Sequence, residues 1–138
     1  MQVTKGGGYG AVGTTDGFIY YTRSSGTEAV SRNEFGVWKI PVDAGEETKV
    51  FDEAGVSGSV HPLNLWVTAD GVYFSNRTAT PGPAIEFYRF ATKETTKLLA
   101  IDRSKFYGTV TASPDGKWIL WPQIDQLDND IMLVENFQ

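Results

Sequence analysis

The feature that most constrains the fold is an Asp-Gly pair that occurs three times, each time between two short runs of strand-forming residues. Both residues of such a pair tolerate the positive φ angles of a tight turn, so the pair between apolar runs is a strong hairpin signal. Successive pairs lie 54 and 45 residues apart: Asp16-Gly17, Asp70-Gly71 and Asp115-Gly116. A hairpin repeated at this period predicts a chain built from three similar antiparallel units.

Each hairpin is followed by a third strand-like run, and in the first two units by a fourth. Helical periodicity is scarce, because the apolar residues alternate or form short runs rich in Val, Ile, Tyr, Phe, Trp and Thr. The two strands of each hairpin are expected at 9–13 and 18–21, at 63–67 and 72–74, and at 107–111 and 117–121. Third strands are expected at 37–42, 85–90 and 130–135, and fourth strands at 47–51 and 95–99. Three units in 138 residues average 46 residues each. A four-stranded unit of that length is typical of a propeller blade, and a β-sandwich with coincidental turns is the alternative.

The segment 112–120 reads Ala-Ser-Pro-Asp-Gly-Lys-Trp-Ile-Leu. It resembles the signature of the WD40-like repeats in TolB-type bacterial propellers. Segment 37–50 resembles the third strand, turn and fourth strand of that repeat, and segment 130–137 resembles a last blade. The motif is reduced to Thr-Thr-Asp-Gly at 14–17 and Thr-Ala-Asp-Gly at 68–71. The resemblance implies a bacterial propeller scaffold, and it implies no catalytic residues because the family has no universal set.

We therefore expect an all-β fold, with three four-stranded antiparallel meanders as consecutive propeller blades. The whole chain, 1–138, would form one half-propeller domain, with blades at about 9–51, 63–100 and 107–137. Three blades are too few to close a ring, since propellers have about four or more. Two copies would supply the six blades of a common ring size.

The expected joint between two copies is an exchanged strand. The third unit has no fourth strand before Gln138, whereas residues 2–5 resemble the fourth strand at 47–50. In a head-to-tail homodimer the first strand of each copy would pair with the last blade of the other and satisfy its open edge. The expected interface residues are Gln2, Val3, Thr4, Ile131, Leu133 and Glu135. A fragment of a longer propeller and other ring sizes are the alternatives.

Composition excludes several classes of protein. Seventeen acidic against twelve basic residues give a net charge of -5, which argues against a nucleic-acid-binding surface. The absence of cysteine excludes disulfides, thiolate metal sites and cysteine nucleophiles. No run approaches the roughly 18 apolar residues that cross a membrane, and the first eight residues hold no apolar targeting region. We expect a cytoplasmic protein that does not contact a membrane.

No nucleophile elbow, P-loop or dinucleotide fingerprint occurs in the chain, and His61 is its single histidine. The expected function is a non-enzymatic binding or scaffold module, whose loops around a propeller channel bind a protein, a peptide or a small molecule. The loop 24–34 would dominate the rim, and His61 would lie near the channel. Candidate ligand-binding residues are Glu28, Arg32, Glu34, His61 and Arg77.

The segment 125–130 concentrates carboxylates at Asp125, Asp128 and Asp130. Oxygen ligands at this spacing could hold Ca²⁺, although Asp and Asn are also common in turns between strands. The alternative function is therefore a hydrolase or lyase that uses carboxylates in the channel, assisted by calcium; no other cofactor is expected. The aromatic residues on predicted strands are expected to pack between blades: Trp66, Tyr73, Phe74, Trp118 and Trp121.

Overall fold

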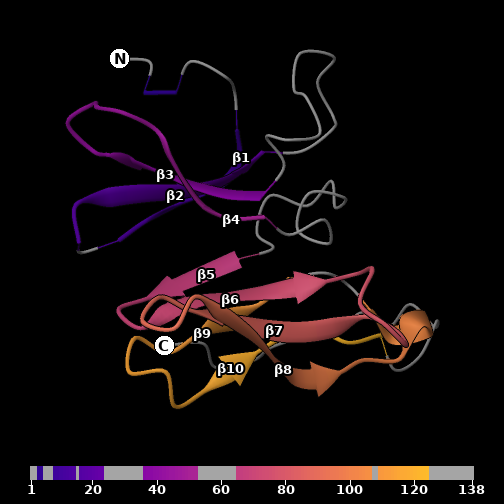
Figure 1. The fold of residues 1–138 in the computed structure, drawn as a ribbon. Coiled ribbons are helices and arrows are strands. Elements are labelled where there is room, and N and C mark those ends of the chain that lie inside the picture. The colour runs from indigo at the N-terminus through magenta and orange to yellow at the C-terminus, as the bar shows by residue number, and fades with distance from the viewer. Residues whose placement is uncertain are drawn as a thin grey trace, which may run out of the picture.

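The computed structural model describes residues 3–4, 8–14, 16–23, 36–52, 65–106 and 109–124, and the description that follows concerns these residues. This part of the chain is all-β apart from one 3₁₀ turn, Arg103–Lys105. Its strands form three antiparallel sheets, and hydrogen-bonded neighbours within each sheet are consecutive in the chain (Figure 1).

The first two sheets are four-stranded meanders, as the repeat predicts. The first sheet comprises β1 (Tyr9–Gly13), β2 (Phe18–Arg23), β3 (Gly36–Pro41) and β4 (Thr48–Phe51). The second comprises β5 (Leu65–Thr68), β6 (Gly71–Asn76), β7 (Ala84–Arg89) and β8 (Glu94–Ala100). Their bounds agree with the predicted strands to within two residues. The antiparallel meander is therefore confirmed for both units.

The third sheet is smaller in the described part of the chain. It pairs β9 (Thr111–Ala112) with β10 (Ile119–Leu120) around the third Asp-Gly turn. The strands predicted here at 107–111 and 117–121 are thus shorter and begin later than expected. An isolated bridge between Phe106 and Gln123 extends the pairing irregularly. The third strand predicted at 130–135 lies outside the described residues.

The second sheet is buried on both of its faces. Successive side chains of β6 point to opposite faces, so Val72 and Phe74 lie on one face and Tyr73 on the other. The first core, between the first and second sheets, consists of Tyr20, Val37, Leu65, Val72, Phe74 and Tyr88. The second core, between the second and third sheets, consists of Tyr73, Ile85, Phe87, Val110 and Ala112. The sheets therefore stack face to face, in chain order.

The stack has one edge where the first strands meet. β1 contacts β5, and β5 contacts β9, and these are the most extensive contacts between strands of different sheets. β8, the fourth strand of the second sheet, is exposed along its whole length. Figure 1 shows the first sheet in indigo and magenta above the second sheet, with β9 and β10 on the other side of the second sheet. The first strands of the three sheets thus lie next to one another, whereas the fourth strand of the second sheet is exposed.

The burial of the aromatic residues agrees only in part with the prediction. Tyr73 and Phe74 are buried and Trp66 is partly buried, as expected. Trp118 is 73% exposed, so its predicted place between sheets is wrong for the isolated chain, and Trp121 is also exposed. Side chains alternate along β10. Because Ile119 faces the second core, its neighbours Trp118 and Leu120 face away from that core.

Candidate functional site

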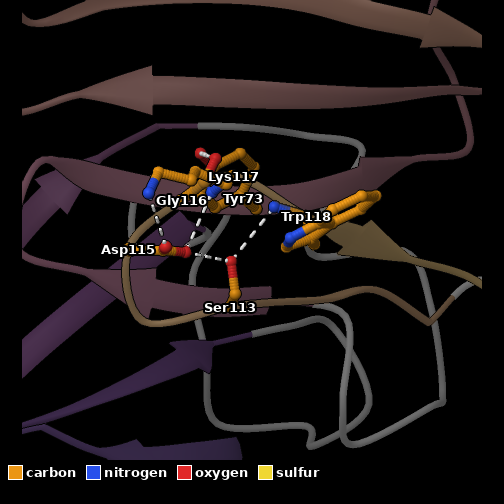
Figure 2. A network of polar contacts seen from close by, with 6 residues as sticks. All are labelled: Tyr73, Ser113, Asp115, Gly116, Lys117 and Trp118. Carbon is orange, nitrogen blue, oxygen red and sulfur yellow. Dashed lines mark hydrogen bonds and ion pairs between the residues drawn. The ribbon is translucent and has the colours of Figure 1, made fainter.

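The Ser-Pro-Asp-Gly turn is a closed network of polar contacts (Figure 2). Ser113 Oγ donates to Asp115 Oδ1 at 2.6 Å and accepts from the Trp118 backbone N–H at 3.0 Å. The Lys117 backbone N–H also donates to Asp115 Oδ1, at 3.2 Å. These donors, Ser113 first, hold the pKa of Asp115 below its ordinary value. The motif residues therefore stabilise a hairpin turn.

The equivalent turn of the first sheet uses the same chemistry. Asp16 Oδ1 accepts from the Thr14 hydroxyl and, at 3.0 Å, from the Phe18 backbone N–H. Asp16 Oδ2 accepts from the Tyr20 hydroxyl at 2.9 Å. Burial alone would raise the pKa of Asp16, but these hydrogen bonds outweigh it and lower the pKa. Gly17 has a φ of 82°, which explains why glycine follows the aspartate.

A groove opens between the first and second sheets at the end where these turns lie. Its volume is about 1110 Å³, and we call it the inter-sheet groove. It is lined by Asp16, Tyr20, Lys39, Trp66, Tyr88, Phe90 and Lys93, among others from β1, β4 and the three Asp-Gly turns. The rings of Tyr20 and Phe90 stack across the sheets, with centroids 5.9 Å apart.

Lys39 is the unusual residue of this groove. It is half-buried, and its Nζ lies 4.3 Å from the ring centroid of Phe18 and 6.0 Å from that of Tyr20. It forms no ion pair with any residue that the structure describes. The sequence prediction did not select it. The sequence feature that could have identified Lys39 is its alternation with Val37 and Pro41, which places a lysine on an otherwise apolar face of β3.

A second charged cluster lies on the opposite face of the first sheet. Arg23, whose side chain is 7% exposed, forms an ion pair with Glu47 and lies with its guanidinium carbon 4.1 Å from the Trp38 ring centroid. Burial alone would lower the pKa of Arg23, but the contact with Glu47 raises it. Burial, with help from Glu47, raises the pKa of Tyr21 to about 12. Arg23 Nε is buried without a hydrogen-bond partner.

In the described part of the chain, the first and third sheets each have a face that no other described sheet covers. On the first sheet this face, the first end face, carries the partly buried Trp38 and the buried Ile40, which is 1% exposed, and a pocket of about 340 Å³ joins them to Val3, Gly45, Glu46 and Glu47. On the third sheet the last end face carries Trp118 and Leu120, 73% and 67% exposed. An apolar pocket of about 300 Å³ lies beside it, lined by Leu65, Trp66, Val110, Leu120, Trp121 and Pro122 among others.

Few of the sequence-predicted site residues fall in the described part of the chain. Arg77 is exposed in the turn after β6, next to Asn76, whose buried Nδ2 donates to Glu86 Oε2 at 3.0 Å. Val3 lies at the first end face with Thr4 beside it in the chain, and neither is in a strand. The other predicted residues lie outside the described residues: Gln2, Glu28, Arg32, Glu34, His61, Asp125, Asp128, Asp130, Ile131, Leu133 and Glu135.

The structure does not test the predicted calcium site. Among the described residues no three His, Asp or Glu side chains gather in a group that could hold a metal ion. The aspartates at 125–130 are not among them, so calcium binding there stays a prediction. In the same part of the chain no helix is long and apolar enough to span a membrane.

Comparisons of the chain with protein-family models, with curated proteins and with solved structures found no match. Its function is therefore argued from its own residues.

Proposed function

We propose that this chain is half of a β-propeller, a non-enzymatic binding or scaffold module that completes its ring with a second copy of itself. The observation that carries the proposal is the stacking of the sheets. The second sheet is covered on both faces, through Val72 and Phe74 on one side and Tyr73 on the other. The third sheet presents Trp118 and Leu120 to solvent. Large apolar groups in this position are expected to pack on another sheet.

The position of the strands supports a propeller rather than a β-sandwich. In a propeller the first strands of all blades surround the central channel and the fourth strands lie at the rim. Here β1 contacts β5 and β5 contacts β9, whereas β8 is exposed along its length. A sandwich would pair two large sheets, whereas this chain stacks three in succession.

The first end face suits the last end face of a second copy. It offers the partly buried Val3 and Trp38 beside a pocket of about 340 Å³ that large side chains such as Trp118 and Leu120 could enter, and the buried Ile40 also lines this pocket. Joining unlike faces head to tail closes a ring after two copies if each supplies half of the rotation. The position of Val3 at this face agrees with the proposal that residues 2–4 contribute to the joint.

The ligand of the assembled ring would bind at the loops around the channel, because propeller function resides in loops that a rigid scaffold positions. The loop after β6, with Arg77, is one of these. The acidic balance of the chain favours a protein, a peptide or a small molecule over a nucleic acid.

The absence of cysteine allows a direct test of head-to-tail pairing. Leu120→Cys, at the last end face, and Glu46→Cys, at the first, are made in separate chains, mixed and oxidised. We expect a disulfide-linked dimer from the mixture and little from either variant alone. Leu98→Cys on the exposed β8 strand is the control, since Leu98 is 44% exposed but lies away from both end faces. The proposal is contradicted if Leu98→Cys forms as much disulfide-linked dimer with Glu46→Cys as Leu120→Cys does. It is also contradicted if Leu120→Cys alone forms as much dimer as the mixture.

A further inference from the structure

We propose that the inter-sheet groove binds a small organic anion with a flat apolar body, and that Lys39 holds its anionic group. The groove lies between two sheets of one chain, so the site does not depend on the pairing of two copies. It is also distinct from the channel loops, because it opens at the end of the sheets where the Asp-Gly turns lie.

The first argument is the charge of Lys39. Its position opposite Tyr20 in the register of β2 and β3 places it on the face of the first sheet that looks toward the second sheet. Its ammonium lies against two aromatic rings, and the Asp16 carboxylate interacts with it electrostatically without forming an ion pair. Lysine is seldom buried without an ion pair, because leaving water costs free energy that an anion in contact with the ammonium offsets. A half-buried lysine in a groove is therefore suited to an anionic ligand.

The second argument is that the nearest carboxylate is already engaged. Asp16 is the one acidic residue among the described residues that line the groove. Both of its oxygens accept hydrogen bonds within its own turn, from Thr14, Phe18 and Tyr20. Lys49, which pairs with Asp52, and Lys93, exposed in the turn between β7 and β8, add two further cations to the lining. The lining thus carries more positive than negative charge, although the chain as a whole is acidic.

The third argument is the shape of the apolar wall. The Tyr20 and Phe90 rings are nearly parallel, with an interplanar angle of 25°, and Phe90 meets Tyr88 edge to face at 72°. Tyr20 and Tyr88 are buried, so the partly buried Phe90 is the ring of the three that a ligand can reach. Val67 adds apolar surface from β5, whereas the Trp66 side chain packs against the second core. The Phe90 ring and the Val67 side chain favour a ligand with a flat apolar body, which can stack on the ring. Together with Lys39 they define an aryl carboxylate or aryl phosphate as the ligand class.

The test uses 2-naphthoate as the probe and 2-naphthalenemethanol as its neutral counterpart, titrated into the full chain by calorimetry. We expect naphthoate to bind more tightly than the alcohol. Lys39→Met should weaken naphthoate binding roughly tenfold or more, the usual effect of losing a charged hydrogen bond. Lys39→Arg should retain most of the affinity. Lys117→Met is the matched control, because Lys117 is exposed in the third turn, pairs with Asp115 and does not line the groove.

Salt dependence gives a second measurement that needs no variant. Raising the salt concentration should weaken naphthoate binding and leave the alcohol unchanged, because salt screens only the charged contact. The proposal is overturned if naphthoate does not bind at millimolar concentration, if the alcohol binds equally well, or if a folded Lys39→Met chain binds naphthoate like the unmodified chain. Naphthoate binding reports on the groove, whereas the molar mass in solution reports on the dimer. The groove proposal and the dimer proposal can therefore be contradicted independently.

Discussion

Tyr88 of β7 stacks on Phe51 of β4, with ring centroids 4.3 Å apart and an angle of 18° between the rings. The Tyr88 hydroxyl also donates to the backbone carbonyl oxygen of Val50 at 3.3 Å. These contacts join the first and second sheets away from the edge where β1 meets β5. The first and second sheets therefore contact each other both at β1 and β5 and at β4 and β7, and two separate contacts restrict the angle between the sheets.

This contact predicts unequal effects of two substitutions. Phe51→Ala removes a stacked ring and leaves a cavity between the sheets, so it should lower the free energy of unfolding by about 3 kcal/mol. Tyr88→Phe keeps the stack and loses one hydrogen bond, which should cost about 1 kcal/mol. Urea unfolding monitored by tryptophan fluorescence measures both. A larger loss for Tyr88→Phe than for Phe51→Ala would contradict the packing described.

Substitution by alanine should affect stability differently at two strand glycines, Gly71 and Gly13. A Cβ at Gly71 would lie 2.0 Å from the Tyr88 carbonyl oxygen and 2.7 Å from Phe87 Cζ. Gly71→Ala should therefore destabilise the chain by about 2 kcal/mol or more, because backbone must move. Gly13→Ala is the control, since no atom lies within 4 Å of its Cβ position. Thermal melting compares them, and similar melting temperatures would contradict the close pairing of β6 and β7.

The Arg23–Glu47 pair predicts a non-additive double substitution. Arg23→Met alone leaves the partly buried Glu47 carboxylate without its cation and should cost about 3 kcal/mol. Adding Glu47→Gln removes that charge, so the double variant should be more stable than the sum of the two single losses implies. Denaturant unfolding of the two single variants and the double variant gives the coupling energy. Strict additivity would show that the pair does not interact as described.

Asp16 predicts a specific pH dependence of stability. Its pKa in the folded chain is below the ordinary value of 3.8, so the unfolded chain binds a proton more readily. Its contribution is therefore complete above the unfolded pKa and is lost as the pH falls from about 4 through the lower folded value. Asp16→Asn should reduce the loss of stability over this interval. An unchanged acid transition in Asp16→Asn would contradict the hydrogen bonds assigned to the carboxylate.

The hairpins could be predicted from the sequence because their signals are local. Asp70-Gly71 fixes a turn, and the alternation on either side fixes which residues pair, so β5 to β8 lie close to their predicted ranges. The exposure of Trp118 could not be predicted in this way. Whether its face of β10 is covered depends on which sheet follows it in space, and no local pattern carries that information.

The groove and the Arg23 cluster could not be predicted for a similar reason. Arg23 lies beyond the strand predicted at 18–21 and just before the loop predicted at 24–34, but β2 extends to it and brings it against Trp38 and Glu47. Lys39 looks like an ordinary charged residue on a strand until the second sheet packs over its face. Both sites are formed by segments that only the fold brings together.

The most direct test of the stacked half-propeller is the molar mass in solution, measured by light scattering on the eluting peak. The account predicts a dimer of twice the chain mass of 15.2 kDa, about 30 kDa. Leu120→Glu at the last end face should shift that peak toward the monomer, whereas Leu98→Glu on β8 should not. A well-behaved monomer of 15.2 kDa at micromolar concentration would contradict the account.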